Sequence, residues 1–124
     1  MEHLVELAKQ LGFAAAHRLP TLPPTHARAR LHGHSYRVEV MVRGPVDARL
    51  GWVIDFAEIT AAARPIVDAL DHRCLNEIEG LSNPTSENLA RWIWHRLAPQ
   101  LPLLFAVTIS ATCTPRCTYR GDNP

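Results

Sequence analysis

Residues 31–43 read LHGHSYRVEVMVR, and from Ser35 onward apolar and polar side chains alternate along the segment. A repeat of two residues is typical of a β-strand that buries one of its faces. The segment 35–43 is therefore predicted to be a half-buried strand. Its apolar face would carry Tyr36, Val38, Val40 and Val42.

Two helices are predicted downstream of this strand from capping residues and apolar spacing. Asp55 and Glu58 resemble a capping box, and apolar residues recur at helical spacing from there to Leu70. A second start signal lies at residues 83–86, and the amphipathic stripe that follows it runs to about Leu97. The chain is therefore expected to place two helices in succession.

The C-terminal part returns to the period of a strand, whereas the opening part is ambiguous. Apolar residues alternate over 105–111, Pro115 closes that segment, and a short strand through Tyr119 is expected to return. Residues 4–9 and 14–16 favour a helix by composition alone. Their secondary structure is left open at this point.

Composition excludes several classes of function. The 124 residues include 13 basic and 12 acidic ones, giving a net charge of +1 without a basic block, so binding to nucleic acid or to a membrane surface is not expected. No apolar stretch approaches the roughly 20 residues of a membrane-spanning helix. Three cysteines without a CxxC pair, behind a polar N-terminus, predict a cytoplasmic protein with reduced thiols. The length predicts a single domain over residues 1–124.

The histidines suggest a metal site. His32 and His34 share the Tyr36 face of the predicted strand, and side chains at such positions start roughly 7 Å apart, close enough to converge on one ion. His17 is a candidate third ligand, because the proline-rich loop at 20–24 can fold its segment back beside His32. Three histidines with an open fourth position would form a catalytic rather than a structural zinc site. The alternative is that His17 packs as an ordinary half-buried histidine.

Asp71 and His72, at the end of the first predicted helix, form a second constellation. A carboxylate beside an imidazole can set its tautomer and suits a general acid/base pair. Alternatively, His72 and Arg73 are cations favoured by the negative end of the helix dipole. Spacing alone does not decide between these two interpretations.

Five motifs in order resemble the 6-pyruvoyltetrahydropterin synthase and 6-carboxytetrahydropterin synthase family over nearly the whole chain. They are FAAAHRL at 13–19, LHGHSY at 31–36, VIDF at 53–56, LDHRCLN at 70–76 and NPTSEN at 83–88. Each motif alone is weak evidence for the resemblance, whereas all five in this order are specific to the family. The resemblance makes the opening segment a strand, since tertiary context commonly overrides a weak helix propensity.

The resemblance implies an α+β tunnelling fold (T-fold). In that fold an antiparallel β-β-α-α-β-β unit assembles into an oligomeric barrel, usually as trimers that pair into hexamers. It also implies that His17, His32 and His34 bind catalytic Zn²⁺ and that the substrate is 7,8-dihydroneopterin triphosphate. Asp71 and His72 match two members of the family's proton relay, whose third member is a cysteine.

Two positions depart from the family pattern. The family's cysteine lies four residues before HGH, where this chain has Arg28. Arginine does not act as an ordinary general base at working pH, but it can hold a phosphate or carboxylate through two hydrogen bonds. Ala111 stands where the family has a glutamate that accepts hydrogen bonds from the pterin ring. Leaving that ring edge unpaired would cost roughly 1–3 kcal/mol, so a standard pterin is expected to bind poorly.

Other residues could take part in the site. Thr85 and Glu87 match the family's T-x-E and are candidate substrate contacts; alternatively, they only start the second helix. Cys74, Cys113 and Cys117 are candidate replacements for the missing thiol, although a buried inert thiol is the default for each. His26, close to Arg28, is an equal candidate.

The sequence therefore predicts a zinc-dependent lyase, cleaving a carbon–oxygen or carbon–carbon bond of 7,8-dihydroneopterin triphosphate or a related pterin-like substrate. It would act as a homo-oligomer. The alternative is a diverged zinc-binding homologue without standard synthase activity that binds a different anionic small molecule. A purely structural zinc module is a third interpretation, which predicts that chelation unfolds the protein.

Overall fold

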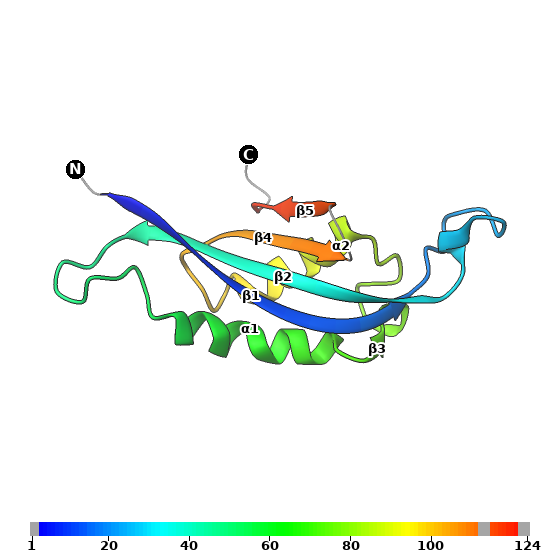
Figure 1. Cartoon of the computed structure of the whole chain (residues 1–124), viewed down its shortest axis with the longest axis horizontal. Coiled ribbons are helices and arrows are strands. Elements are labelled where there is room, and N and C mark those ends of the chain that lie inside the picture. Colours follow the sequence, from blue (N-terminus) through cyan, green and yellow to red (C-terminus); the bar gives the residue numbers. More distant parts are fainter. Residues whose placement is uncertain (1–2, 112–114, 122–124) are drawn as a thin grey trace.

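The computed structural model describes residues 3–111 and 115–121 and shows one five-stranded sheet with two helices (Figure 1). The sheet order is β3-β1-β2-β4-β5, and α1 packs against β1 while α2 packs against β4 and β5. This α+β arrangement confirms the predicted fold class. The elements in chain order are β1 (Leu4–His17), β2 (His32–Pro45), α1 (Phe56–Leu70), β3 (Arg73–Cys74), α2 (Ser86–Leu97), β4 (Leu104–Ala111) and β5 (Arg116–Tyr119).

The two longest strands, β1 and β2, form an antiparallel ribbon that runs the length of the molecule (Figure 1). Their register extends from Leu4 opposite Pro45 to His17 opposite His32. The alternation seen in the sequence sets the faces, because Val38, Val40 and Val42 are fully buried. The strand expected from the resemblance at the opening of the chain is confirmed, and its helix propensity is overridden by pairing with β2.

Both predicted helices are present and begin at the expected capping residues. The Asp55 carboxylate accepts a hydrogen bond from the Ala57 amide at 2.9 Å, and the Thr85 hydroxyl accepts one from the Asn88 amide at 3.1 Å. A side-chain acceptor at this position satisfies one of the free amides of a helix start. The apolar stripes of the helices then bury against the sheet, with Ile59, Leu70, Leu89, Ile93 and Leu97 among the most buried side chains.

The strand β3 was not predicted from the sequence. β3 is two residues long and pairs in parallel with the end of β1, placing Arg73 opposite Ala15 and Cys74 opposite Ala16. Two residues are too few to show a periodic pattern, so this strand has no signal in the sequence. β3 matters because it fixes the turn containing Asp71 and His72 beside β1.

The outer edges of the sheet are only partly covered. Within the described residues, β3 is the strand recorded on the outer edge of β1, and it reaches only Ala15 and Ala16. β5, four residues long, forms the opposite edge. Unpaired strand edges are sites where another chain can add a strand.

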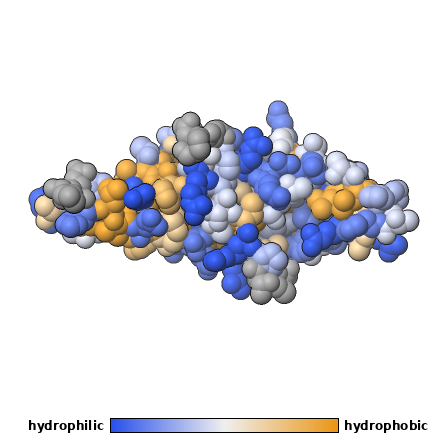
Figure 2. Space-filling view, turned by 90° about the horizontal axis from the view of Figure 1, so that it is seen from above, coloured by the Kyte–Doolittle hydropathy of each residue, from blue (hydrophilic) through white to orange (hydrophobic). Residues whose placement is uncertain are grey.

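The molecular surface is mixed in character. Figure 2 shows hydrophilic residues over most of the visible face, with hydrophobic areas toward its two ends. Exposed apolar side chains include Leu31 beside one end of the ribbon and Leu4 and Val46 at the other. Among the described residues, neither helix has the length and apolar character needed to cross a membrane.

Candidate metal centre and active site

His17, His32 and His34 lie together at one end of the β1–β2 ribbon. His17 stands opposite His32 in the strand register, and Ala15 stands opposite His34, so all three imidazoles project from the same face. Their ring centroids are 4.6–5.0 Å apart. One ring nitrogen of each lies within 4.8 Å of those of the other two, an arrangement that could hold a metal ion.

Two of the three rings are oriented by hydrogen bonds at their Nδ1 atoms. The Nδ1 atom of His17 lies 2.7 Å from the Oη atom of Tyr36, and the Nδ1 atom of His32 lies 2.7 Å from the carbonyl oxygen of Arg30. Metal-binding histidines commonly use their second nitrogen in this way. The donor set therefore fits a metal bound through Nε2 atoms, and three neutral imidazoles suit zinc and several other first-row ions.

Burial keeps the His17 imidazole neutral. Its side chain is 8% exposed. Burial is the main cause that lowers the His17 pKa from 6.5 to about 4, and His32, His34 and the Arg28 guanidinium lower it further. Burial also lowers the pKa of His34, with contributions from His32 and Arg28. A neutral imidazole has the lone pair that a metal requires.

The lowered His17 pKa predicts a pH-dependent stability of the metal-free protein. Below pH 6.5 the unfolded chain binds a proton at His17 that the folded chain takes up only near pH 4. The contribution of His17 to the free energy of unfolding is therefore complete above pH 6.5 and is lost as the pH falls toward 4. Thermal unfolding of chelator-treated protein should show a midpoint that falls over this range. The midpoint of the matched His17→Asn variant should depend less on pH. Parallel profiles of midpoint against pH for the two proteins would contradict the assignment of this dependence to His17.

A cavity of about 700 Å³ adjoins the histidines and brings distant segments together. It contains four of the residues singled out in the sequence, namely Arg28, Thr85, Glu87 and Ala111. His17 and His34 form part of the same wall. Thr85 and Glu87 therefore both start α2 and face the cavity, so the two interpretations of these residues are compatible.

The backbone around Arg28 is fixed. Its carbonyl oxygen accepts a hydrogen bond from the Leu19 amide at 2.9 Å, and its own amide donates to Nδ1 of His26 at 3.1 Å. His26 thus caps the short 3₁₀ turn Ala27–Ala29. His26 is absent from the described lining of the histidine cavity, whereas Arg28 is part of it.

Tyr36 lines this cavity but was not assigned to the site from the sequence, and Cys117 was only a candidate replacement for the missing thiol. Tyr36 was predicted only as a core residue, although its position two residues after His34 on the same strand face was the signal for its contact with the histidines. Cys117 was treated as an inert thiol by default, yet it lies in the cavity. Burial and the nearby Glu87 carboxylate raise the pKa of Cys117, which keeps the thiol protonated. Cys113 lies outside the described residues.

Asp71 and His72 lie at the edge of β1. The Asp71 carboxylate accepts a hydrogen bond from the Ala14 amide at 2.9 Å, and its other oxygen lies 3.0 Å from Nδ1 of His72. The bond from Ala14 is the main cause that lowers the Asp71 pKa, and His72 lowers it further. The His72 imidazole is 81% exposed.

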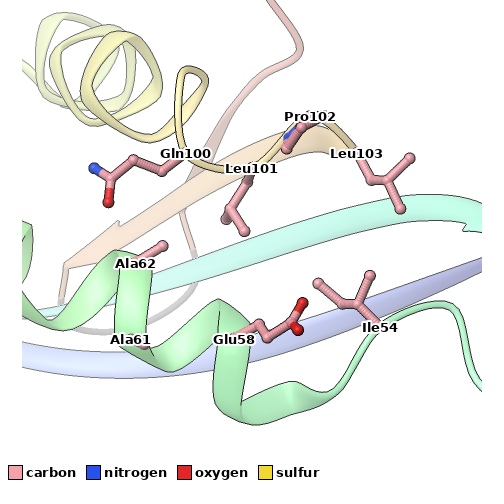
Figure 3. Close-up of a pocket in the computed structure, with 8 residues that line it drawn as sticks. All are labelled: Ile54, Glu58, Ala61, Ala62, Gln100, Leu101, Pro102 and Leu103. Carbon is pink, nitrogen blue, oxygen red and sulfur yellow. The ribbon is translucent and has the colours of Figure 1, made fainter.

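His72 lines a different cavity from the one that contains His17 and Arg28. His72 and Cys74 belong to a second cavity of about 690 Å³, which shares only His34 with the described lining of the first. A third cavity, of about 530 Å³, lies between α1 and residues 100–103, and Figure 3 shows Glu58 and Leu101 among its lining residues. None of the predicted site residues lines this third cavity. A single chain therefore does not bring Asp71 and His72 into the cavity that contains His17 and Arg28.

His72 has a backbone conformation that L-residues rarely adopt, with φ of 58°. Its amide donates to the Ala14 carbonyl at 2.6 Å, which holds the turn against β1. Glycine has no steric penalty in this region, whereas alanine retains it. His72→Gly is therefore expected to be more stable than His72→Ala by about 1 kcal/mol, while both lose the imidazole. Urea unfolding of the pair measures the difference, and equal stabilities would show that the turn is unstrained.

Comparison with known proteins places these features in a family. A family model described as 6-pyruvoyl tetrahydropterin synthase matches residues 6–122. The chain is 38% identical to a 6-carboxy-5,6,7,8-tetrahydropterin synthase of Synechocystis over 120 residues, covering 90% of this chain and 89% of that protein. It is 43% identical to a dihydroneopterin monophosphate aldolase of Pyrococcus furiosus over 72 residues, covering 58% of this chain and 60% of that protein.

The structural comparison agrees with the sequence comparison. A solved structure of Caenorhabditis elegans 6-pyruvoyl tetrahydropterin synthase superposes with a TM-score of 0.88 at 31% identity, covering 98% of each chain. The predicted T-fold is thereby confirmed at the level of the single chain. From its motifs, its fold and these matches, the chain belongs to the 6-pyruvoyl tetrahydropterin synthase family.

Proposed function

We propose that the protein is a zinc-dependent lyase acting on 7,8-dihydroneopterin triphosphate or a related pterin-like substrate. The observation that carries the proposal is the convergence of His17, His32 and His34 within 4.8 Å of one another, with His17 and His34 on the wall of a cavity of about 700 Å³. Relatives named as a synthase and as an aldolase support both carbon–oxygen and carbon–carbon bond cleavage as candidate reactions.

The three histidines would hold the ion and leave one position open to substrate. Zinc bound there would polarise a hydroxyl or carbonyl oxygen of the substrate side chain. The residues around it bind and orient the ligand. The Glu87 carboxylate can accept a hydrogen bond from the ligand, the Thr85 hydroxyl can donate while it caps α2, and Arg28 holds a phosphate group.

Asp71 and His72 supply the proton transfer in this proposal. With the Nδ1 proton of His72 donated to Asp71, the Nε2 atom is free to accept or release a proton. We place this pair in a homo-oligomer, in trimers or hexamers as the resemblance implies. The parts of the β1 and β5 edges that no described strand covers provide strands for such an assembly. In it, His72 of one copy can face the histidine cavity of another.

The test is an incubation of zinc-loaded protein with 7,8-dihydroneopterin triphosphate, followed by mass spectrometry. The expected result for wild type is loss of the substrate mass and appearance of a cleaved pterin. The His72→Gly variant should leave the substrate mass unchanged. Unchanged masses for this compound and for close pterins would count against the lyase assignment. Zinc content measured on the same sample separates a failure of metal binding from a failure of catalysis.

A second candidate function is favoured by the two departures in the cavity. Arg28 occupies the position of the family's cysteine, and Ala111 occupies that of its glutamate, so the base and the pterin anchor are both replaced. The protein would then be a zinc-binding homologue that takes a different anionic small molecule. A third interpretation, a structural zinc module, is disfavoured because three histidines leave the ion open.

A further inference from the structure

The contact between Tyr36 and His17 has a chemical consequence for the metal centre. The Oη atom of Tyr36 lies 2.7 Å from Nδ1 of His17, and the two residues are 2% and 8% exposed. Both also line the cavity beside the histidine cluster. A buried hydrogen bond of this length fixes the orientation of the imidazole and leaves it two possible tautomers.

The two tautomers differ in their ability to bind a metal. When the Tyr36 hydroxyl donates to Nδ1, the proton of the neutral imidazole is on Nε2, which then has no lone pair for an ion. When Nδ1–H of His17 donates to Oη, the Nε2 lone pair is free. We infer that Tyr36 is a positioning residue of the proposed metal centre, whose Oη accepts the Nδ1 proton of His17 and holds Nε2 toward the ion. Metal loading therefore selects one direction of this hydrogen bond.

The surroundings of Tyr36 keep its hydroxyl in place for this role. Its ring stacks on Phe13 with centroids 4.8 Å apart and an interplanar angle of 11°. Phe13 is its partner across the β1–β2 ribbon, and Ala111 is its partner on β4, so neighbouring strands hold the backbone on both sides. A phenol held in this way is a suitable acceptor for one imidazole N–H.

A purely structural role makes a different prediction. If the hydroxyl only satisfies a buried polar pair, its removal lowers the stability of the metal-free fold and leaves zinc affinity unchanged. If it positions His17, its removal lowers affinity for the metal, because partners of metal-bound histidines typically contribute 10–100-fold. Affinity and stability measured separately therefore distinguish the two roles. The inference rests on the proposed metal centre, which wild-type zinc binding tests on its own.

The experiment compares zinc affinity in wild type, Tyr36→Phe and a control, by competition with a chromophoric chelator. Tyr36→Phe keeps the ring that stacks on Phe13 and should bind zinc 10–100-fold more weakly. Trp92→Phe removes a buried aromatic donor from a 2.9 Å bond to the Glu79 carbonyl, in a different part of the core, and should bind zinc as wild type does. Equal affinities of wild type and Tyr36→Phe would overturn the inference.

A second measurement does not depend on a variant. In the zinc-loaded wild type, ¹⁵N–¹H spectra of the His17 ring should show a proton on Nδ1 that exchanges slowly with water. A loaded His17 ring bound through Nδ1, or one without this proton, would overturn the inference. A wild type that binds no zinc would overturn the proposed metal centre itself. That outcome differs from a wild type that binds zinc and a Tyr36→Phe variant that binds it equally tightly, which would overturn only the role of Tyr36.

Discussion

Replacement of His34 by alanine is expected to lower the zinc affinity of the protein by roughly 100-fold or more. The physical reason is that the described residues offer no fourth histidine, cysteine or carboxylate to this group, and the other two rings are held in their orientations by their own hydrogen bonds. The fold should survive, because His34 is only half-buried and its strand pairs on both sides. Metal content after dialysis and chelator competition measure the loss.

The control for this variant is His3→Ala, which removes an exposed histidine at the start of the chain. It should leave both metal content and affinity unchanged. A His34→Ala protein that retains wild-type affinity would show that zinc binds elsewhere and would remove the main support for the proposed function. Circular dichroism of the metal-free proteins separates lost coordination from lost folding.

The double substitution Arg28→Cys with Ala111→Glu is expected to raise turnover of 7,8-dihydroneopterin triphosphate by roughly 100-fold or more over wild type, within the range that a positioned general base provides. Both positions line the histidine cavity, so the new thiol and carboxylate would face the same space. The change restores the two residues of the family pattern that this chain lacks.

The two single variants separate the effect on substrate binding from the effect on the rate of the chemical step. Ala111→Glu alone should lower KM, because it returns an acceptor for the pterin ring, whereas Arg28→Cys alone should raise kcat. The matched control Arg28→Ser with Ala111→Gln has similar shapes without a thiolate or a carboxylate and should remain slow. Continued inactivity of the double variant, together with tight binding of an unrelated anion by wild type, would favour the diverged homologue.

The fold followed from local patterns where the segments were long enough to show them. The valines of β2 are fully buried, as their alternation predicts, and Asp55 and Thr85 cap the helices that their positions indicate. The opening strand was different, because its local propensity favours a helix and only the resemblance to the family predicted a strand there; the structure pairs it with β2. β3 was not predicted, because its formation depends on pairing with the neighbouring end of β1.

Only part of the candidate site was predicted, because local patterns indicate neighbours within a strand but not contacts between distant segments. The grouping of His32 and His34 follows from strand spacing, and the register of β1 then brings His17 to them. Cavity neighbours such as Cys117 come from β5, far away in sequence, and no local pattern links them to the histidines. The separation of His72 from that cavity depends on where a turn packs beside β1, which single-residue spacing does not encode.

In the part of the chain that the structure describes, the short β3 strand leaves most of the outer edge of β1, from Leu4 to Ala14, without a strand partner. If a second copy covers this edge in solution, part of the stability of each chain comes from association. The thermal unfolding midpoint should then rise with protein concentration, because mass action favours the assembled state. Dilution by itself would then lower the stability of each chain.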